Sequence, residues 1–101
     1  MKLKIAEVIL DNGDIDLIFD ELTKREDFKL ILDKYLEIKE VRLVKETEDE
    51  FKKACLLETD NFQFVLVYDS DSFVWNYMYA VKRENHGLLK ELCRSVAEFI
   101  S

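Results

Sequence analysis

The sequence predicts an α+β fold: an antiparallel meander sheet of about four strands, an N-terminal hairpin and two amphipathic helices. Three observations support this prediction. Residues 61–81 hold two dense apolar runs joined by a short acidic turn, which is typical of two paired strands. An Asn-Gly pair separates two apolar runs near the N-terminus. Apolar residues recur at helical spacing in about residues 23–37 and 86–100.

The 101 residues fit a single domain, 1–101, because a domain of this size buries roughly two-thirds of its unfolded surface in one core. Hydrophobic residues make up 49% of the chain, so we do not expect disorder. No apolar run approaches the ~20 residues that a membrane span requires, so we expect a cytoplasmic protein. Cys55 and Cys93 lie among apolar neighbours and are expected to be buried free thiols.

The N-terminal apolar run from Lys2 to Leu10 alternates loosely and leads into Asn12-Gly13. Both central residues of a type I′ turn have positive φ, so this pair predicts a hairpin whose return strand spans Ile15 to Phe19. A helix that begins at Asp14 is the alternative, because residues 15, 18, 19 and 22 also fit helical spacing.

The first predicted helix spans about residues 23–37. Thr23 and Glu26 have the spacing of a capping box, which marks the start of a helix. The apolar residues that follow at helical spacing are Phe28, Ile31, Leu32, Tyr35 and Leu36. In the closing helix, Asn85 is a suitable N-cap. The apolar stripe there comprises Leu88, Leu89, Leu92, Cys93, Val96, Phe99 and Ile100.

Four meander strands are predicted between the helices. They span Glu40–Glu46, Phe51–Glu58, Phe62–Tyr68 and Phe73–Lys82. A turn at residues 59–61 would pair Leu57 with Phe64 and Leu56 with Val65. The second strand has a helical alternative, because Thr47 and Glu50 have the spacing of another capping box.

The register of the last two strands decides which side chains share a face. A four-residue loop that pairs Tyr68 with Phe73 also pairs Leu66 with Trp75, Phe64 with Tyr77 and Phe62 with Tyr79. These residues would form one aromatic face. The other face would hold Val65, Val67, Val74, Met78 and Ala80. Both faces are apolar, so both require cover.

Two arrangements of the helices are open. If both helices cover the aromatic face, the opposite face stays exposed and marks an interface. Its candidate residues are Val65, Val67, Val74 and Met78, and a homodimer is the expected assembly. If the helices lie on different faces, or the hairpin folds across the sheet, a monomer is possible.

The net charge of −7 is unevenly distributed: residues 5–23 contain six acidic residues and no basic one. An acidic surface repels nucleic acid and anionic lipid and attracts basic proteins. We therefore expect no direct nucleic-acid binding, no membrane contact and a basic protein partner. The candidate partner-binding residues form a first cluster of Asp11, Asp14, Asp16, Asp20 and Glu21, and a second of Glu48, Asp49 and Glu50.

Catalytic and metal-binding patterns are weak. His86, the single histidine, lies seven residues before Cys93, and the helical rise of ~10 Å between them prevents a nucleophilic pair. Residues 11–22 fail as a calcium-binding EF-hand loop, because Gly13 is third rather than sixth and Glu21 is eleventh rather than twelfth. We predict no catalytic residue, no metal and no cofactor.

The sequence favours a small acidic, non-catalytic protein-binding module. Its carboxylates would dock onto a basic protein surface, as in an inhibitor, immunity or anti-defence protein that mimics nucleic-acid phosphates. The alternative is a homodimeric scaffold or chaperone-like module that binds apolar peptide on the sheet face or its edge.

Overall fold

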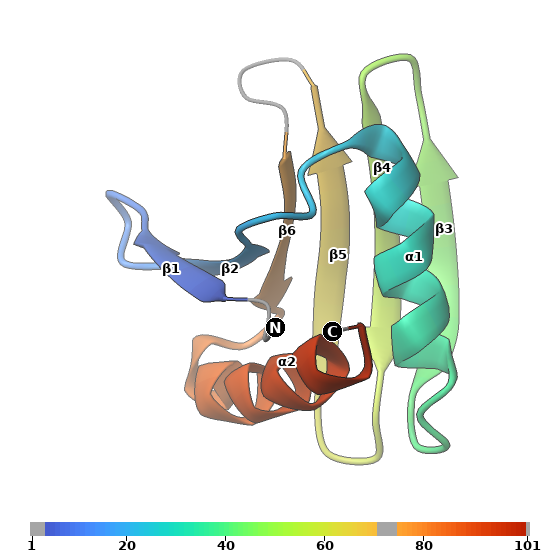
Figure 1. Cartoon of the computed structure of the whole chain (residues 1–101). Helices are drawn as coiled ribbons and strands as arrows, with labels where there is room; N and C mark the ends of the chain where they lie inside the picture. Colours follow the sequence, from blue (N-terminus) through green and yellow to red (C-terminus); the bar gives the residue numbers. More distant parts are fainter. Residues whose placement is uncertain (1–3, 71–74, 101) are drawn as a thin grey trace.

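The computed structural model describes residues 4–70 and 75–100, which form one antiparallel sheet and two α-helices (Figure 1). The strands are β1 (Ile5–Ile9), β2 (Ile15–Phe19), β3 (Arg42–Glu48), β4 (Lys52–Glu58), β5 (Gln63–Asp69) and β6 (Trp75–Ala80). The helices are α1 (Arg25–Leu36) and α2 (His86–Ile100), and the 3₁₀ turn η1 (Arg83–Asn85) leads into α2. The α+β prediction is confirmed.

The sheet has six strands in the order β1-β2-β6-β5-β4-β3. The hairpin and the four meander strands, which the sequence predicts as separate units, join where β2 pairs with β6. Leu17 lies opposite Met78 there, and Ile18 lies opposite Tyr77. The predicted sheet of about four strands was therefore too small, because no local signal shows that the N-terminal hairpin pairs with the last strand.

The N-terminal hairpin is confirmed, but its turn type was wrong. Gly13 has φ +89°, but no described residue other than glycine has a positive φ. Asn12 therefore lacks the positive φ that a type I′ turn requires at both central positions. Gly13 N–H donates to the Leu10 carbonyl at 2.9 Å, and Leu10 N–H donates to the Asp14 carbonyl at 2.8 Å. This is the three-residue loop in which a type I turn is followed by a left-handed glycine.

Helix α1 begins at Arg25, one residue later than a Thr23 cap allows. The N-cap is Lys24, whose backbone N–H donates to the Asp27 carboxylate at 3.0 Å. The predicted Thr23–Glu26 box was therefore wrong by one position. Phe28, Ile31, Leu32 and Tyr35 are buried as the spacing predicts, whereas Leu36 is 39% exposed.

Residues 52–58 form the strand β4, so the helical alternative was wrong. The pairs Leu57–Phe64 and Leu56–Val65 are confirmed. Strand β3 lies at the edge of the sheet and begins two residues later than predicted, with a bulge between Leu43 and Lys45.

The predicted register of β5 and β6 was wrong by three residues. Val65 lies opposite Tyr79, and Val67 lies opposite Tyr77, since a longer loop joins the strands. An odd shift exchanges the faces of a strand, so both tyrosines share a face with the valines. Met78 lies on the other face opposite Leu66. Phe73, the predicted partner of Tyr68, and Val74, which was predicted on the opposite face, lie outside the described residues.

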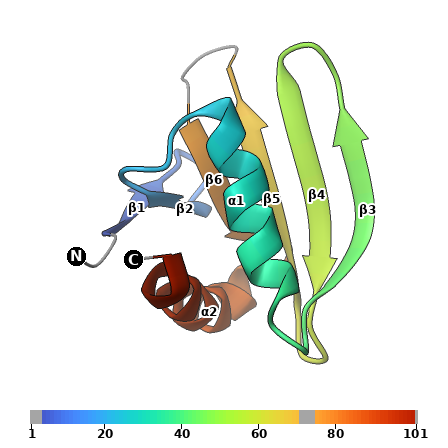
Figure 2. The same cartoon turned by 45° about the vertical axis from the view of Figure 1, so that its right-hand side comes forward.

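Both helices cover the same face of the sheet (Figure 2). The buried core cluster joins residues of α1 and α2 to Leu17, Cys55, Phe64, Leu66 and Met78, which share one side of the strands. The second face has no helix over it. The shared-face arrangement is therefore observed, although the face that the helices leave uncovered carries Tyr77 and Tyr79.

Candidate functional site

Both cysteines are free and buried, as predicted. Cys93 lies 2.9 Å from the Tyr35 hydroxyl and 3.4 Å from the Met78 sulfur. Burial raises the pKa of the Cys93 thiol to about 12 and that of the Cys55 thiol to about 11. A nucleophilic cysteine needs a lowered pKa and access to solvent, so both thiols are inert.

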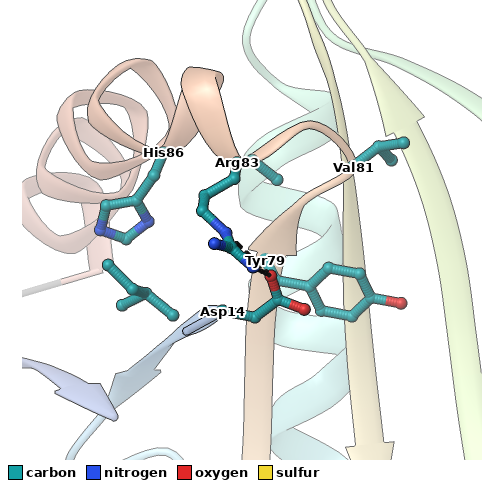
Figure 3. A pocket seen from close by; sticks show the side chains of 7 residues that line it. Asp14, Tyr79, Val81, Arg83 and His86 are labelled. Atoms are coloured by element: carbon teal, nitrogen blue, oxygen red, sulfur yellow. Dashed lines mark hydrogen bonds and ion pairs between the residues drawn. The ribbon is translucent and has the colours of Figure 1, made fainter. Parts of the chain in front are cut away.

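His86 points toward a small pocket at the junction of β2, β6 and η1 (Figure 3). Its Nε2 lies 3.3 Å from Glu7 Oε1, to which Lys90 Nζ also binds at 2.7 Å. These contacts, first with Lys90 and then with His86, hold the pKa of Glu7 below its ordinary value. His86 Nδ1 is buried and has no partner among the described residues.

The pocket itself is small, and an internal ion pair lies in it. Arg83 binds Asp14 at 2.9 Å across the pocket, beside Tyr79 (Figure 3). The volume of about 90 Å³ holds a few water molecules, well below the ~300 Å³ of a typical ligand pocket. The described residues also contain no group of three His, Cys, Asp or Glu side chains placed to bind a metal.

The first predicted acidic cluster is spread along the N-terminal hairpin. Asp11 lies in the turn, while Asp20 and Glu21 follow the other end of β2. Asp14 is engaged by Arg83 and by the Asn12 amide. The structure therefore divides the cluster: Asp14 and Asp16 are close enough for Asp14 to raise the pKa of Asp16, whereas Asp20 and Glu21 lie beyond the far end of β2.

The second predicted cluster lies at the β3–β4 turn, across the sheet from the hairpin (Figure 1). Glu48 binds Arg25 at 3.0 Å and Lys53 at 3.6 Å. The Asp49 carboxylate accepts the backbone N–H groups of Phe51 and Lys52 at 2.8 Å. Asp49 and Glu50 are both exposed without an ion pair among the described residues, and Glu50 has no side-chain hydrogen bond there either.

Two hollows of about 470 and 460 Å³ adjoin each other and share Glu40, Leu92 and Ser95 in their lining. Their lining residues come from α2, the loop after α1 and the β4–β5 turn, three segments that lie at the lower end of the molecule in Figure 1. We call this surface the α2 groove. Its apolar floor comprises Ile38, Phe62, Leu88, Leu92 and Phe99. Phe99 is 62% exposed and Leu88 is 42% exposed, so the floor is open to a partner.

The charged residues that line the α2 groove are all acidic. They are Glu37, Glu40, Asp60 and Glu91, and no Lys, Arg or His lines either hollow. Glu37 binds Lys34 and Asp60 binds Arg42, both outside the lining. Glu40 and Glu91 have no side-chain ion pair among the described residues, so their charge is uncompensated.

The candidate interface residues Val65, Val67, Val74 and Met78 do not share one surface. Val65 and Val67 lie on the uncovered face of the sheet. Met78 is 0% exposed beneath the helices, so its assignment to an exposed face was wrong. Val74 lies outside the described residues.

No family model, curated protein or solved structure matches this chain. Within the described residues, neither helix has both the length and the apolar character that crossing a membrane would require.

The α2 groove was not predicted from the sequence, because three segments far apart in the chain form it. One signal was present: Leu88, Leu92 and Phe99 widen the apolar stripe of α2 beyond what one core-facing side needs. The acidic rim could not be found, since Glu40, Asp60 and Glu91 meet only through the fold.

Proposed function

We propose that this protein is a small, non-catalytic protein-binding module whose partner inserts a basic amphipathic segment into the α2 groove. The observation that carries the proposal is an exposed apolar floor bordered by charged residues that are all acidic. Such a surface matches a segment that places apolar side chains on the floor and Lys or Arg side chains at the rim. Nucleic-acid-binding proteins commonly carry such basic segments, so this chain would act as an inhibitor or immunity protein against one of them.

The dimensions of the groove favour a helical segment over a small molecule. Leu88, Leu92 and Phe99 follow one another at helical spacing along α2, over a rise of ~16 Å. That length corresponds to about three turns of a partner helix, whose anchors at positions i, i+3 or i+4, and i+7 would contact the floor.

The α2 groove is a better acidic docking surface than the two predicted clusters. Glu40 and Glu91 lie beside exposed apolar side chains, so they would be partly desolvated when a partner binds. Asp14 and Glu48 are already paired with arginines, and an exposed carboxylate elsewhere contributes little to affinity.

The test is a fluorescence anisotropy titration with a designed helical peptide that carries leucine on one face and lysine beside it. Two control peptides separate the contributions of shape and charge. One has the same composition in scrambled order, and the other has glutamate in place of lysine. We expect binding of the first peptide only, with an affinity that falls as salt rises.

Variants of the protein then locate the site. We expect Glu40→Lys with Glu91→Lys to weaken binding about tenfold, because two favourable rim contacts become repulsive. Phe99→Ala should weaken binding by a similar factor through lost floor contact. The matched control is Asp11→Lys with Glu50→Lys, which makes the same charge change in the two predicted clusters.

Two results would contradict the proposal. Equal binding of the scrambled peptide would show a non-specific charge effect. A larger loss from the Asp11 and Glu50 control than from the groove variants would transfer the function to the predicted clusters.

A further inference from the structure

The face of the sheet opposite the helices, which we call the open face, is largely apolar. Two rows of side chains cross it from β2 to β3. The first row comprises Tyr79, Val65, Leu56 and Lys45, and Asp16 on β2, two residues before Ile18, lies beside Tyr79 at its end. The second row comprises Ile18, Tyr77, Val67, Ala54 and Thr47. Neither α-helix covers these rows (Figure 2).

Two side chains at the centre of the open face are nearly inaccessible to solvent. Ile18 is 4% exposed and Val67 is 2% exposed, although neither belongs to the core cluster beneath the helices. The rings of Tyr77 and Tyr79 stack at 6.4 Å with an angle of 23° between their planes. The neighbouring Val65, Ala54 and Leu56 are only partly buried, so apolar side chains on this face remain accessible to a partner.

The charges of the first row lie at its two ends. Asp16 is on β2 and Lys45 is on β3, four strand spacings apart, which is about 19 Å. Neither side chain has an ion pair among the described residues. Burial, and then the neighbouring Asp14, raise the pKa of Asp16, so its charged form lacks a stabilising partner in the single chain.

We propose that the open face binds a second copy of this chain about a two-fold axis parallel to the strands. An axis above β5 reverses the strand order, so β2 of each copy lies over β3 of the other. Asp16 of each copy then meets Lys45 of the other, and the tyrosines of β6 pack over Leu56 and Ala54 of β4. An axis perpendicular to the strands would place β2 of each copy over β2 of the other, so Asp16 and Lys45 would not meet.

This interface is independent of the α2 groove, which lies on the helical side of the molecule. The two surfaces can therefore be tested separately. In the dimer the two grooves would face outward on opposite sides.

Sedimentation equilibrium with a charge exchange tests the proposal. We expect the wild-type chain to form dimers as concentration rises. Asp16→Lys alone and Lys45→Asp alone should each weaken dimerisation at least about fivefold, because each replaces two attractive pairs with two repulsive ones. The double variant should restore the wild-type constant, since the pairs are rebuilt with exchanged signs. Circular dichroism of each variant controls for folding.

A second experiment tests the position of the axis. Val65→Cys places a thiol near its own copy, so a short bismaleimide reagent should link two chains. Glu98→Cys, on an exposed part of α2, should not link, and the native thiols are buried. A monomeric wild-type chain at about 1 mM, or a double variant no better than the single ones, would overturn the proposal.

Discussion

Asn76 is a fully buried polar residue within the apolar strand β6. Its amide Nδ2 donates to the backbone carbonyls of Leu22 and Lys24, both at 2.9 Å. These carbonyls belong to the connection between β2 and α1, so one side chain ties the start of α1 to the centre of the sheet. The sequence gives no sign of this role, because the acceptors are more than 50 residues away.

Replacing Asn76 should be strongly destabilising. Asn76→Leu keeps the approximate volume but leaves two backbone carbonyls without their donor, so we expect a loss of about 2–4 kcal/mol in the free energy of unfolding. Urea denaturation measures this loss, with Asn61→Leu in the exposed β4–β5 turn as the control. A loss below about 1 kcal/mol would show that water replaces the donor.

The buried thiol of Cys93 should make the protein less stable at alkaline pH. The pKa of Cys93 is raised from 9.0 to about 12 in the folded protein, so stability is fully present below pH 9 and declines as pH rises toward 12. At pH 10 this one group should lower the free energy of unfolding by about 1.4 kcal/mol. Urea denaturation at a series of pH values measures the decline, and Cys93→Ala should have a shallower decline relative to its own value at neutral pH.

At the scale of elements, the N-terminal hairpin depends on the backbone of Gly13. A side chain there meets two costs: φ is +89°, and an added Cβ would lie 3.2 Å from the Arg83 guanidinium. Arg83 binds Asp14 and the Asn12 carbonyl, so it links the hairpin turn to η1.

Gly13→Ala should therefore destabilise the protein by about 1–2 kcal/mol. The matched control is Gly87→Ala in the first turn of α2, where no heavy atom lies within 4 Å of an added Cβ. Since alanine favours a helix over glycine, this control should stabilise the protein by about 0.5–1 kcal/mol. Thermal unfolding of both variants checks the prediction, and equal effects of the two changes would contradict it.

Local patterns in the sequence predicted most elements and their partners along the chain. The return strand Ile15–Phe19, the helix 86–100 and the Leu57–Phe64 pair were predicted correctly, because a turn or a repeating apolar pattern specifies each one. The register of β5 and β6 was predicted wrongly. It depends on the length of the loop between the two strands, and the apolar pattern does not specify that length. A shift of three residues was enough to move Met78 into the core.

At the scale of the whole molecule, the sheet has one face covered by both helices and one open face. Contacts between segments that are far apart in the sequence determine this arrangement. Strand β2 pairs with β6, and Ile38, Phe62 and Leu92 meet in the α2 groove. The amino-acid composition predicted an acidic protein with more apolar residues than its own core would cover. Only the fold shows which carboxylates lie beside the exposed apolar residues.

An amide chemical-shift titration of the isotope-labelled protein with the basic amphipathic peptide tests the α2 groove most directly. We expect saturable shifts confined to the three groove segments, which are residues 37–40, 59–62 and 88–99. The same shifts should be absent from the Glu40→Lys, Glu91→Lys double variant at equal peptide concentration. Shifts centred on residues 11–21 or 48–50, or no saturable shift at all, would contradict the account.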